Sequence, residues 1–157
     1  MFEMATEILL ITEAKSSDTK SFYKCNTPLY RCVKSAFEMQ FGNFETDIDF
    51  LAFFEEIKCK IEYLVTEEID RKDMTIRNKQ RSENVDSLSK RLRTHRPKCI
   101  IIIMKDIEKF VLMAIERAKL SEVLFIKSVP FPAMSERNRI NCELGIAEIL
   151  KDYVLGH

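Results

Sequence analysis

Residues 99–104 form an uninterrupted apolar run in which four consecutive isoleucines follow a cysteine. The run does not alternate between polar and apolar positions, so it is predicted to be buried on both of its faces. Six residues are too few to cross a membrane, which takes roughly 20, and β-branched side chains favour a strand. The pattern therefore predicts an inner strand of a parallel sheet with helices on both sides.

Three further segments have patterns typical of strands. Residues 7–13 contain the apolar stretch 8–11 and predict a second inner strand. Residues 60–66 alternate at first and then become apolar, which predicts a strand nearer the edge of the sheet. Residues 122–127 predict the fourth strand.

The segments between these strands are predicted to be mostly helical. Apolar side chains recur at helical spacing, and a residue that suits a helix N-terminus opens or precedes each predicted helix. Those residues are Pro28, Asp49, Asn84, Asp106 and Ser135. Residues 71–81 show no apolar period and are predicted to form a loop. The order of elements predicts a single α/β domain over residues 1–157, a three-layer α/β/α sandwich with a four-stranded parallel sheet.

The composition excludes several classes of protein. A chain of 157 residues with 46% hydrophobic residues is typical of one globular domain. No stretch resembles a signal peptide or a membrane helix, so we expect a cytoplasmic protein without a membrane partner. The five cysteines lack metal-site spacing and only two histidines accompany them, so no metal is expected. Three glycines exclude a glycine-rich phosphate loop, and we expect no cofactor.

The charge is neutral overall but unevenly distributed. Residues 1–70 hold 7 Lys and Arg against 14 Asp and Glu, whereas residues 71–98 hold 10 against 3. Residues 99–157 hold 8 of each. A local basic segment in a neutral protein indicates an anionic partner such as DNA, and the alternative is an ordinary solvated surface.

Function is expected beyond the carboxyl ends of the strands, where open α/β sheets bind their ligands. Small polar residues follow the first predicted strand, and Phe22 and Tyr23 come directly after them. A long loop after an inner strand often carries a site. Glu13 stands at the end of that strand, where a carboxylate has no structural need. The alternative is that Glu13 caps a nearby helix N-terminus.

The order of elements and the polar loop followed by an aromatic residue resemble the uracil-DNA glycosylase superfamily. The likeness spans residues 7–153. Thermophilic, cluster-containing members of that superfamily end their first strand in Gly-Glu-Ala-Pro-Gly, and this chain matches the motif at Glu13 and Ala14. The resemblance implies a uracil-DNA glycosylase-like fold with a four-stranded parallel sheet between helices.

Two positions depart from the superfamily pattern. Tyr63 stands where an asparagine often reads the pyrimidine edge, and Phe131 precedes Pro132 where the superfamily has a His-Pro loop. The imidazole that those enzymes direct at the departing base is therefore absent, as are the four cysteines of the iron–sulfur members. Phe131 cannot donate a hydrogen bond to a departing base, a role for which Lys15 and Lys105 are candidates.

The resemblance implies a divergent glycosylase, a hydrolase of DNA repair that binds DNA and excises a damaged or deaminated base. The catalytic candidates are Glu13 and Asp18, which could hold a water molecule or stabilise the sugar cation. The expected base pocket consists of Ala14, Phe22, Tyr23, Tyr63, Phe131 and Pro132. The expected nucleic-acid contacts are Lys15, Arg71, Arg77, Lys79, Arg81 and Lys105.

Two alternatives remain open. The missing histidine favours a non-catalytic module of the same fold that binds a nucleic acid or a nucleotide. A flavodoxin-like domain with a small-molecule partner ranks last, because the first loop lacks the glycines of a phosphate-binding loop. Every one of these hypotheses requires Glu13, Tyr63 and Phe131 to meet at a common rim of the sheet.

Overall fold

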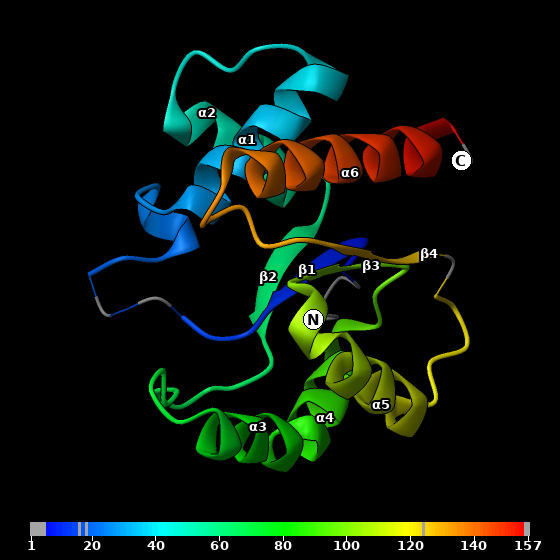
Figure 1. Ribbon diagram of the computed structural model, residues 1–157. Coiled ribbons are helices and arrows are strands. Elements are labelled where there is room, and N and C mark those ends of the chain that lie inside the picture. Colours follow the sequence, from blue (N-terminus) through cyan, green and yellow to red (C-terminus); the bar gives the residue numbers. More distant parts are fainter. Residues whose placement is uncertain (1–5, 16, 18, 124, 156–157) are drawn as a thin grey trace.

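A computed structural model describes residues 6–15, 17, 19–123 and 125–155. Four parallel strands form one sheet in the order β2-β1-β3-β4 (Figure 1). The strands are β1 Ile8–Thr12, β2 Cys59–Tyr63, β3 Cys99–Ile103 and β4 Phe125–Val129. The predicted parallel sheet is confirmed, with the isoleucine-rich β3 and the apolar β1 in its centre.

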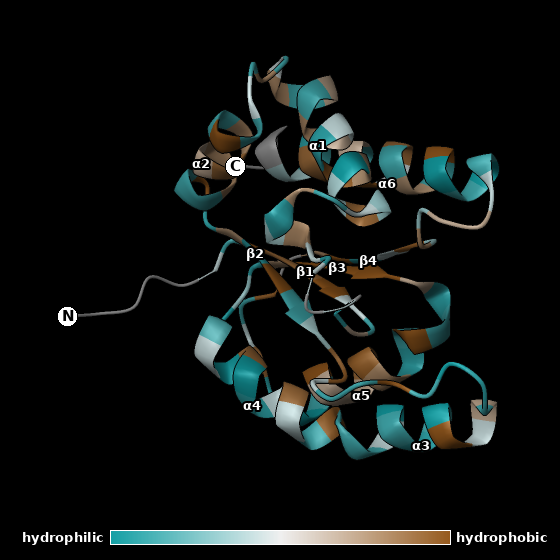
Figure 2. Ribbon diagram, turned by 90° about the vertical axis from the view of Figure 1, so that its left-hand side faces the viewer, coloured by the Kyte–Doolittle hydropathy of each residue, from teal (hydrophilic) through white to brown (hydrophobic). Residues whose placement is uncertain are grey.

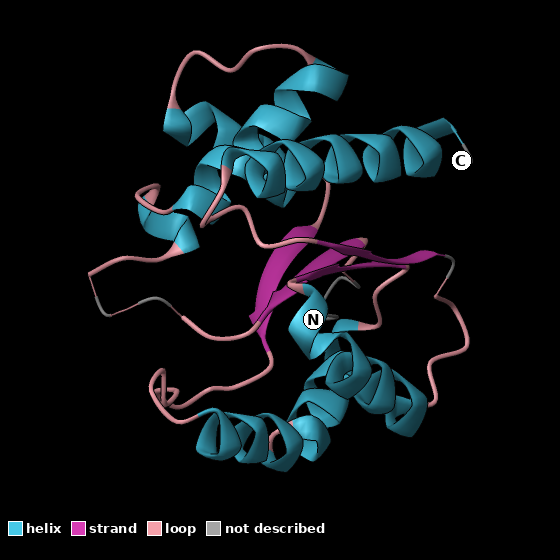
Figure 3. Cartoon of the chain, viewed as in Figure 1, coloured by secondary structure: helices cyan, strands magenta, loops and turns pink. Residues whose placement is uncertain are grey.

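Helices cover both faces of the sheet, which makes three layers (Figure 3). One layer contains α1 Pro28–Phe41, α2 Asp47–Glu56 and α6 Glu136–Leu155, and the other contains α3 Met74–Glu83, α4 Val85–His95 and α5 Glu108–Ala118. Short 3-10 helices, η1 Phe22–Lys24 and η2 Lys105–Ile107, precede α1 and α5. The predicted three-layer α/β/α sandwich is therefore confirmed.

The inner strands explain why their sequences do not alternate. Ile101 and Ile103 pack against the layer of α1, α2 and α6, whereas Ile100 and Ile102 pack against the layer of α4 and α5. All four side chains are fully buried. Figure 2 shows the hydrophobic residues gathered on the sheet and on the inner faces of the helices. Burial on both faces replaces the alternation that a half-exposed strand would show.

Residues 71–81 do not form the predicted loop, because most of them belong to α3. Asp73 caps this helix by accepting hydrogen bonds from the backbone N–H groups of Thr75 and Ile76 at 2.9 and 3.2 Å. The face of α3 that turns inward carries Arg77 and Arg81, while Ile76 lies exposed on the outside. The helix therefore has no inward apolar period, which is why the hydrophobic pattern did not indicate it.

Several predicted helix starts agree with the structure and others shift. α1 begins at Pro28 after the N-cap Thr27, and Ser135 accepts a hydrogen bond from the N–H of Asn138 at the start of α6. α2 begins at Asp47 rather than at Asp49. Asp106 was predicted to cap α5 but lies inside η2, two residues before the helix begins.

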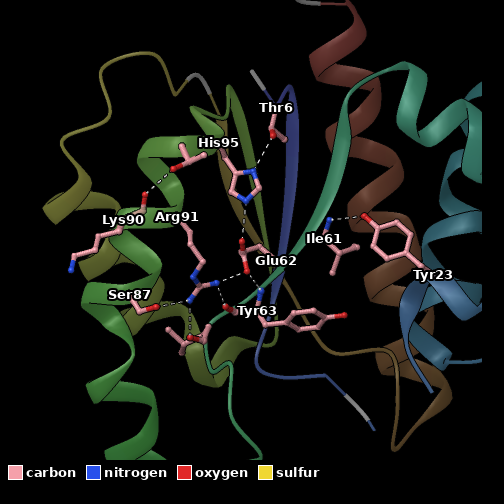
Figure 4. A network of polar contacts seen from close by, with 11 residues as sticks. Thr6, Tyr23, Ile61, Glu62, Tyr63, Ser87, Lys90, Arg91 and His95 are labelled. Atoms are coloured by element: carbon pink, nitrogen blue, oxygen red, sulfur yellow. Dashed lines mark hydrogen bonds and ion pairs between the residues drawn. The ribbon is translucent and has the colours of Figure 1, made fainter. Parts of the chain in front are cut away.

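A polar network ties the edge strand β2 to α4 (Figure 4). Glu62 accepts hydrogen bonds from Arg91 and lies 2.9 Å from Nε2 of His95. Nδ1 of His95 lies 3.1 Å from the hydroxyl of Thr6, which is two residues before β1 in the sequence. Nη1 of Arg91 also donates to the carbonyl of Tyr63 at 2.7 Å. The network therefore holds β2 in place at the edge of the sheet, where β2 has a neighbouring strand on one side only.

Candidate functional site

A cleft of about 580 Å³ opens at the carboxyl ends of the strands. Segments that follow β1, β2, β3 and β4 all contribute to it, and the loops after β1, β2 and β4 lie on the left-hand side of Figure 1. Its lining includes Glu13, Ile69, Arg71, Arg77, Met104, Lys105, Asp106, Phe131 and Asn138. The location agrees with the rule that parallel α/β sheets bind ligands at this edge.

A smaller pocket adjoins the cleft through shared walls. Phe131 lines both, and Phe22 and Tyr63 line the smaller pocket. The structure thus brings Glu13, Tyr63 and Phe131 to a common rim. The smaller pocket has a volume of only about 30 Å³ and is too narrow for a base, so the larger cleft is the candidate site.

Glu13 lies at the floor of the cleft and is held by two arginines of α3. Its carboxylate accepts hydrogen bonds from Nε of Arg77 at 2.9 Å, from Nη2 of Arg77, and from Nε of Arg81 at 2.6 Å. Only 5% of Glu13 is exposed. Glu13 does not cap a helix in these contacts, contrary to the alternative drawn from the sequence.

The surroundings of Glu13 keep it ionised. Burial by itself raises the pKa of this carboxyl group, but the hydrogen bonds and charges of Arg77 and Arg81 outweigh burial and hold the pKa below its usual value. Both carboxylate oxygens are occupied, and a carboxylate of low pKa is a weak proton acceptor. The arrangement suits Glu13 to hold the arginines in place and makes it a poor general base.

The basic residues predicted on this segment are separated in space. Arg81 is 3% exposed and donates through Nη1 to Asn78, so its guanidinium does not face solvent. The side chain of Lys79 is 75% exposed and pairs with Glu83. Arg77 lines the cleft, as do the exposed side chains of Arg71 and Lys105. Arg81 therefore cannot contact a phosphate in this conformation, which corrects the expectation for it.

The aromatic residues of the first loop do not face the cleft. Phe22 is buried and packs against Tyr30 and Phe54 with ring centroids 5.5 and 5.2 Å apart. Tyr23 is 52% exposed at the β2 edge, where its hydroxyl oxygen accepts a hydrogen bond from the N–H of Ile61 at 3.3 Å. Neither ring lines the cleft, and among the aromatic residues of the expected base pocket that the structure describes, Phe131 is the one that does.

The remaining predicted residues surround the site or lie outside it. Ala14 lines both cavities. Pro132 is buried and lines neither of them, contrary to the expectation for it. Lys15 is exposed but does not line the cleft. Asp18 lies outside the described residues.

Besides Thr12 at the end of β1, two polar residues of the cleft were not predicted from the sequence. Asp106 follows β3, and Asn138 lies in the first turn of α6 behind β4. Asp106 is exposed and forms none of the hydrogen bonds or ion pairs found among the described residues, but its negative charge acts on Arg77, which also lines the cleft. The rule that pointed to Glu13 would have found both, because each follows the carboxyl end of a strand.

Two methionines of the cleft have an unusual backbone. Met104 and Met134 have φ of 115° and 76°, in the region that favours glycine. Met134 projects from the loop after β4 with 98% of its surface exposed. Backbone strain of this kind often concentrates at binding sites.

Within the described residues, no three His, Cys, Asp or Glu side chains lie close enough together to hold a metal ion. None of the helices in the same part of the chain combines the length and the hydropathy needed to cross a bilayer.

Comparison of the sequence with protein-family models gives no match, and comparison with curated proteins finds none that is similar.

Proposed function

We propose that this protein binds DNA and that the cleft at the carboxyl edge receives one unpaired nucleotide. The observation that carries the proposal is the composition of this one cleft. The ring of Phe131 and the apolar side chains of Ile69 and Met104 lie beside the exposed cations Arg71 and Lys105. An apolar wall next to cations suits a ligand that has a flat base at one end and a phosphate at the other.

The dimensions and the polar groups of the cleft agree with such a ligand. A volume of about 580 Å³ lies within the range of roughly 300–1,000 Å³ that small-molecule sites occupy. A base that leaves the helical stack is usually held between apolar or aromatic side chains and read by hydrogen bonds. Phe131 provides the ring, and the side-chain amide of Asn138 provides a group that can read a base edge.

Met134 offers a second point of contact with DNA. It stands almost fully exposed on the rim of the cleft. Proteins that distort DNA often insert an apolar side chain between neighbouring bases. Inserted there, Met134 would fill the space that a base leaves when it turns into the cleft. The likeness of the sequence to the uracil-DNA glycosylase superfamily supports the same mode of binding.

Excision of the bound base is the second candidate function, and Asp106 favours it. This exposed carboxylate in the cleft has none of the arginine contacts that occupy Glu13. In excision, a water molecule would attack the anomeric carbon and give a proton to Asp106, while the base leaves as an anion with the electrons of the broken bond and then takes up a proton. Asp106 would take the role that the sequence analysis expected of Glu13.

Binding is tested with fluorescein-labelled single-stranded oligonucleotides that contain one uracil, by fluorescence anisotropy. We expect affinity to fall between about 50 and 200 mM salt, because bound phosphates release counterions. Phe131→Ala should weaken binding about tenfold through the loss of stacking. Leu112→Ala is the matched control, since Leu112 is an exposed apolar residue of α5 outside the cleft. Salt-independent affinity, or equal effects of both variants, would contradict the proposal.

The same oligonucleotides test excision when they are treated with alkali after incubation with the protein. If the protein is a glycosylase, strand breaks appear at the uracil, and Asp106→Asn removes them without abolishing binding. Glu13→Gln should leave some cleavage. Absence of product from uracil and from several damaged bases, while a known glycosylase cleaves in parallel, would reject excision and leave the binding function.

A further inference from the structure

One edge of the Arg77 guanidinium is hydrogen-bonded to Glu13, and the other edge has no hydrogen-bond partner among the described residues. Its Nε donates to Oε2 of Glu13 at 2.9 Å, and its Nη2 donates to Oε1 of the same carboxylate. These two bonds occupy the side of the guanidinium that faces Glu13. Among the described residues, Nη1 has no hydrogen-bond partner, and it is not sealed from solvent. Arg77 also lines the cleft, so its unused donors lie at a cavity rather than in the core.

Arg81 also holds the carboxylate of Glu13 in place. It stands one helical turn after Arg77 on the same face of α3, and its Nε binds Oε2 of Glu13 at 2.6 Å. Asn78 accepts a hydrogen bond from Nη1 of Arg81 at 2.9 Å and fixes that side chain in turn. Two guanidinium groups thus surround one carboxylate, and the cluster keeps a positive charge although Glu13 is ionised.

We propose that Glu13 is a positioning residue which presents the open edge of Arg77 to a phosphate group in the cleft. This inference rests on the proposed function and names the part of the nucleotide that the site recognises. A guanidinium held in a plane can donate two parallel hydrogen bonds to a phosphate. Arg71 and Lys105 line the same cleft and, together with the Arg77–Arg81–Glu13 cluster, outweigh the negative charge of Asp106, which also lines the cleft and acts on Arg77.

The burial of Glu13 is consistent with this role. A carboxylate at a phosphate site repels the ligand unless its charge is neutralised. Here two arginines neutralise it, and in return the carboxylate removes rotational freedom from Arg77 before the ligand arrives. A lysine at the same place could not bind Glu13 through two donors and offer another pair to a phosphate.

The test compares four variants by anisotropy with a labelled single-stranded oligothymidylate, at several salt concentrations. They are Arg77→Gln, Arg77→Lys, Glu13→Gln and the charge-balanced double variant Glu13→Gln with Arg77→Gln. Lys90→Gln is the matched control, because Lys90 is an exposed cation of the neighbouring helix α4 and does not line the cleft. Thermal unfolding followed by circular dichroism verifies that each variant is folded.

We expect Arg77→Gln to weaken binding about tenfold, as loss of a charge-assisted hydrogen bond does. The slope of log K against log salt should fall by about 0.7, the value for one single-strand phosphate contact. The double variant should bind as weakly as Arg77→Gln. Arg77→Lys should restore the slope but not the full affinity. Glu13→Gln should keep the slope and lose affinity about fivefold, because the guanidinium is no longer held.

Each other outcome overturns a defined part of the inference. If Arg77→Gln matches Lys90→Gln in both affinity and slope, Arg77 does not contact phosphate. If Glu13→Gln binds as well as the wild type, Glu13 does not position Arg77. A wild-type protein that does not bind the oligonucleotide at all rejects the proposed function itself, and so separates that failure from the failure of Arg77.

Discussion

At the scale of single residues, two carboxylates remain charged although each is largely buried. The side chains of Glu13 and Glu62 are 7% and 14% exposed. Each lies between two cationic or cation-forming groups, Arg77 and Arg81 for the first and Arg91 and His95 for the second. Removing a charge from water is costly, so such a carboxylate is stable only while its partners are in place.

These contacts predict how stability depends on pH. Burial alone raises the pKa of Glu62, but the hydrogen bonds of His95 and of the Tyr63 N–H and the charge of Arg91 lower it below its usual value. A group whose pKa is lower in the folded state stabilises the fold above the unfolded pKa of about 4.3. The contribution is lost as the pH falls through the folded value, when the carboxylate takes up its proton.

We therefore expect Glu62→Gln to lower the free energy of unfolding by about 2 kcal/mol near pH 7. The difference from the wild type should shrink towards pH 3, because both proteins then carry a neutral group at this position. Urea unfolding followed by circular dichroism at the two pH values measures it. Glu56→Gln, at an exposed position of α2, is the control and should change neither value. A difference that stays constant with pH would show that Glu62 acts through packing alone.

At the scale of elements, close packing decides how α6 lies on the sheet. α6 contacts β4 and runs beside α1 along most of its length. The two elements come close together at Gly145, where an added Cβ would lie 2.7 Å from Cγ1 of Val129. The absent side chain lets the helix approach β4 closely.

Gly145→Ala should consequently destabilise the protein. Alanine is a better helix former than glycine by about 0.5–1 kcal/mol, but overpacking costs about 1–3 kcal/mol. We expect a net loss of about 1 kcal/mol. Val129→Ala removes the atom that the new Cβ would meet, so the double variant should be more stable than the sum of the single effects. Thermal unfolding of the three variants measures the coupling, and simple additivity would show that this contact does not limit the packing.

At the scale of the whole molecule, one sheet is shared by two separate hydrophobic cores. β1 and β3 supply side chains to both cores. If either helical layer separated from the sheet, fully buried residues of these strands would become exposed to solvent. Four of the five cysteines, Cys32, Cys59, Cys99 and Cys142, belong to the core on the side of α1, α2 and α6, whereas Cys25 is only partly buried. Burial also raises the pKa of Cys99 to about 12, which keeps its thiol unreactive.

Thiol labelling tests this shared core. In the native protein a maleimide should modify Cys25 readily and leave the other four unlabelled, because the thiolate and access to it are both required. Labelling of those four should follow the rate of global unfolding, as circular dichroism records it. Cys25→Ser removes the fast phase and is the control. Rapid labelling of Cys32 or Cys142 without loss of secondary structure would show that the helical layer opens independently.

Some features of the cleft could be predicted from the sequence and others could not, for physical reasons. The carboxyl-edge rule identified Glu13, because it depends only on where the strands end. Phe131 and Lys105, which also line the cleft, were named through the resemblance to the uracil-DNA glycosylase superfamily. It did not distinguish the exposed Arg71 from the buried Arg81, since both are basic residues of one polar segment. Phe22 was expected in the base pocket because of its position after β1, but its ring is buried in the core between the sheet and α1.

The sequence by itself determined the layers of this protein, since runs of apolar residues without alternation require burial on two faces. It also determined the edge at which ligands are expected, because parallel strands all end on one side. Only the tertiary structure decided that the arginines of α3 turn inward to Glu13 and that Asp106 lines the same cleft as Arg77. Ion pairs between residues more than 60 positions apart depend on how helices pack, and no local pattern records that packing.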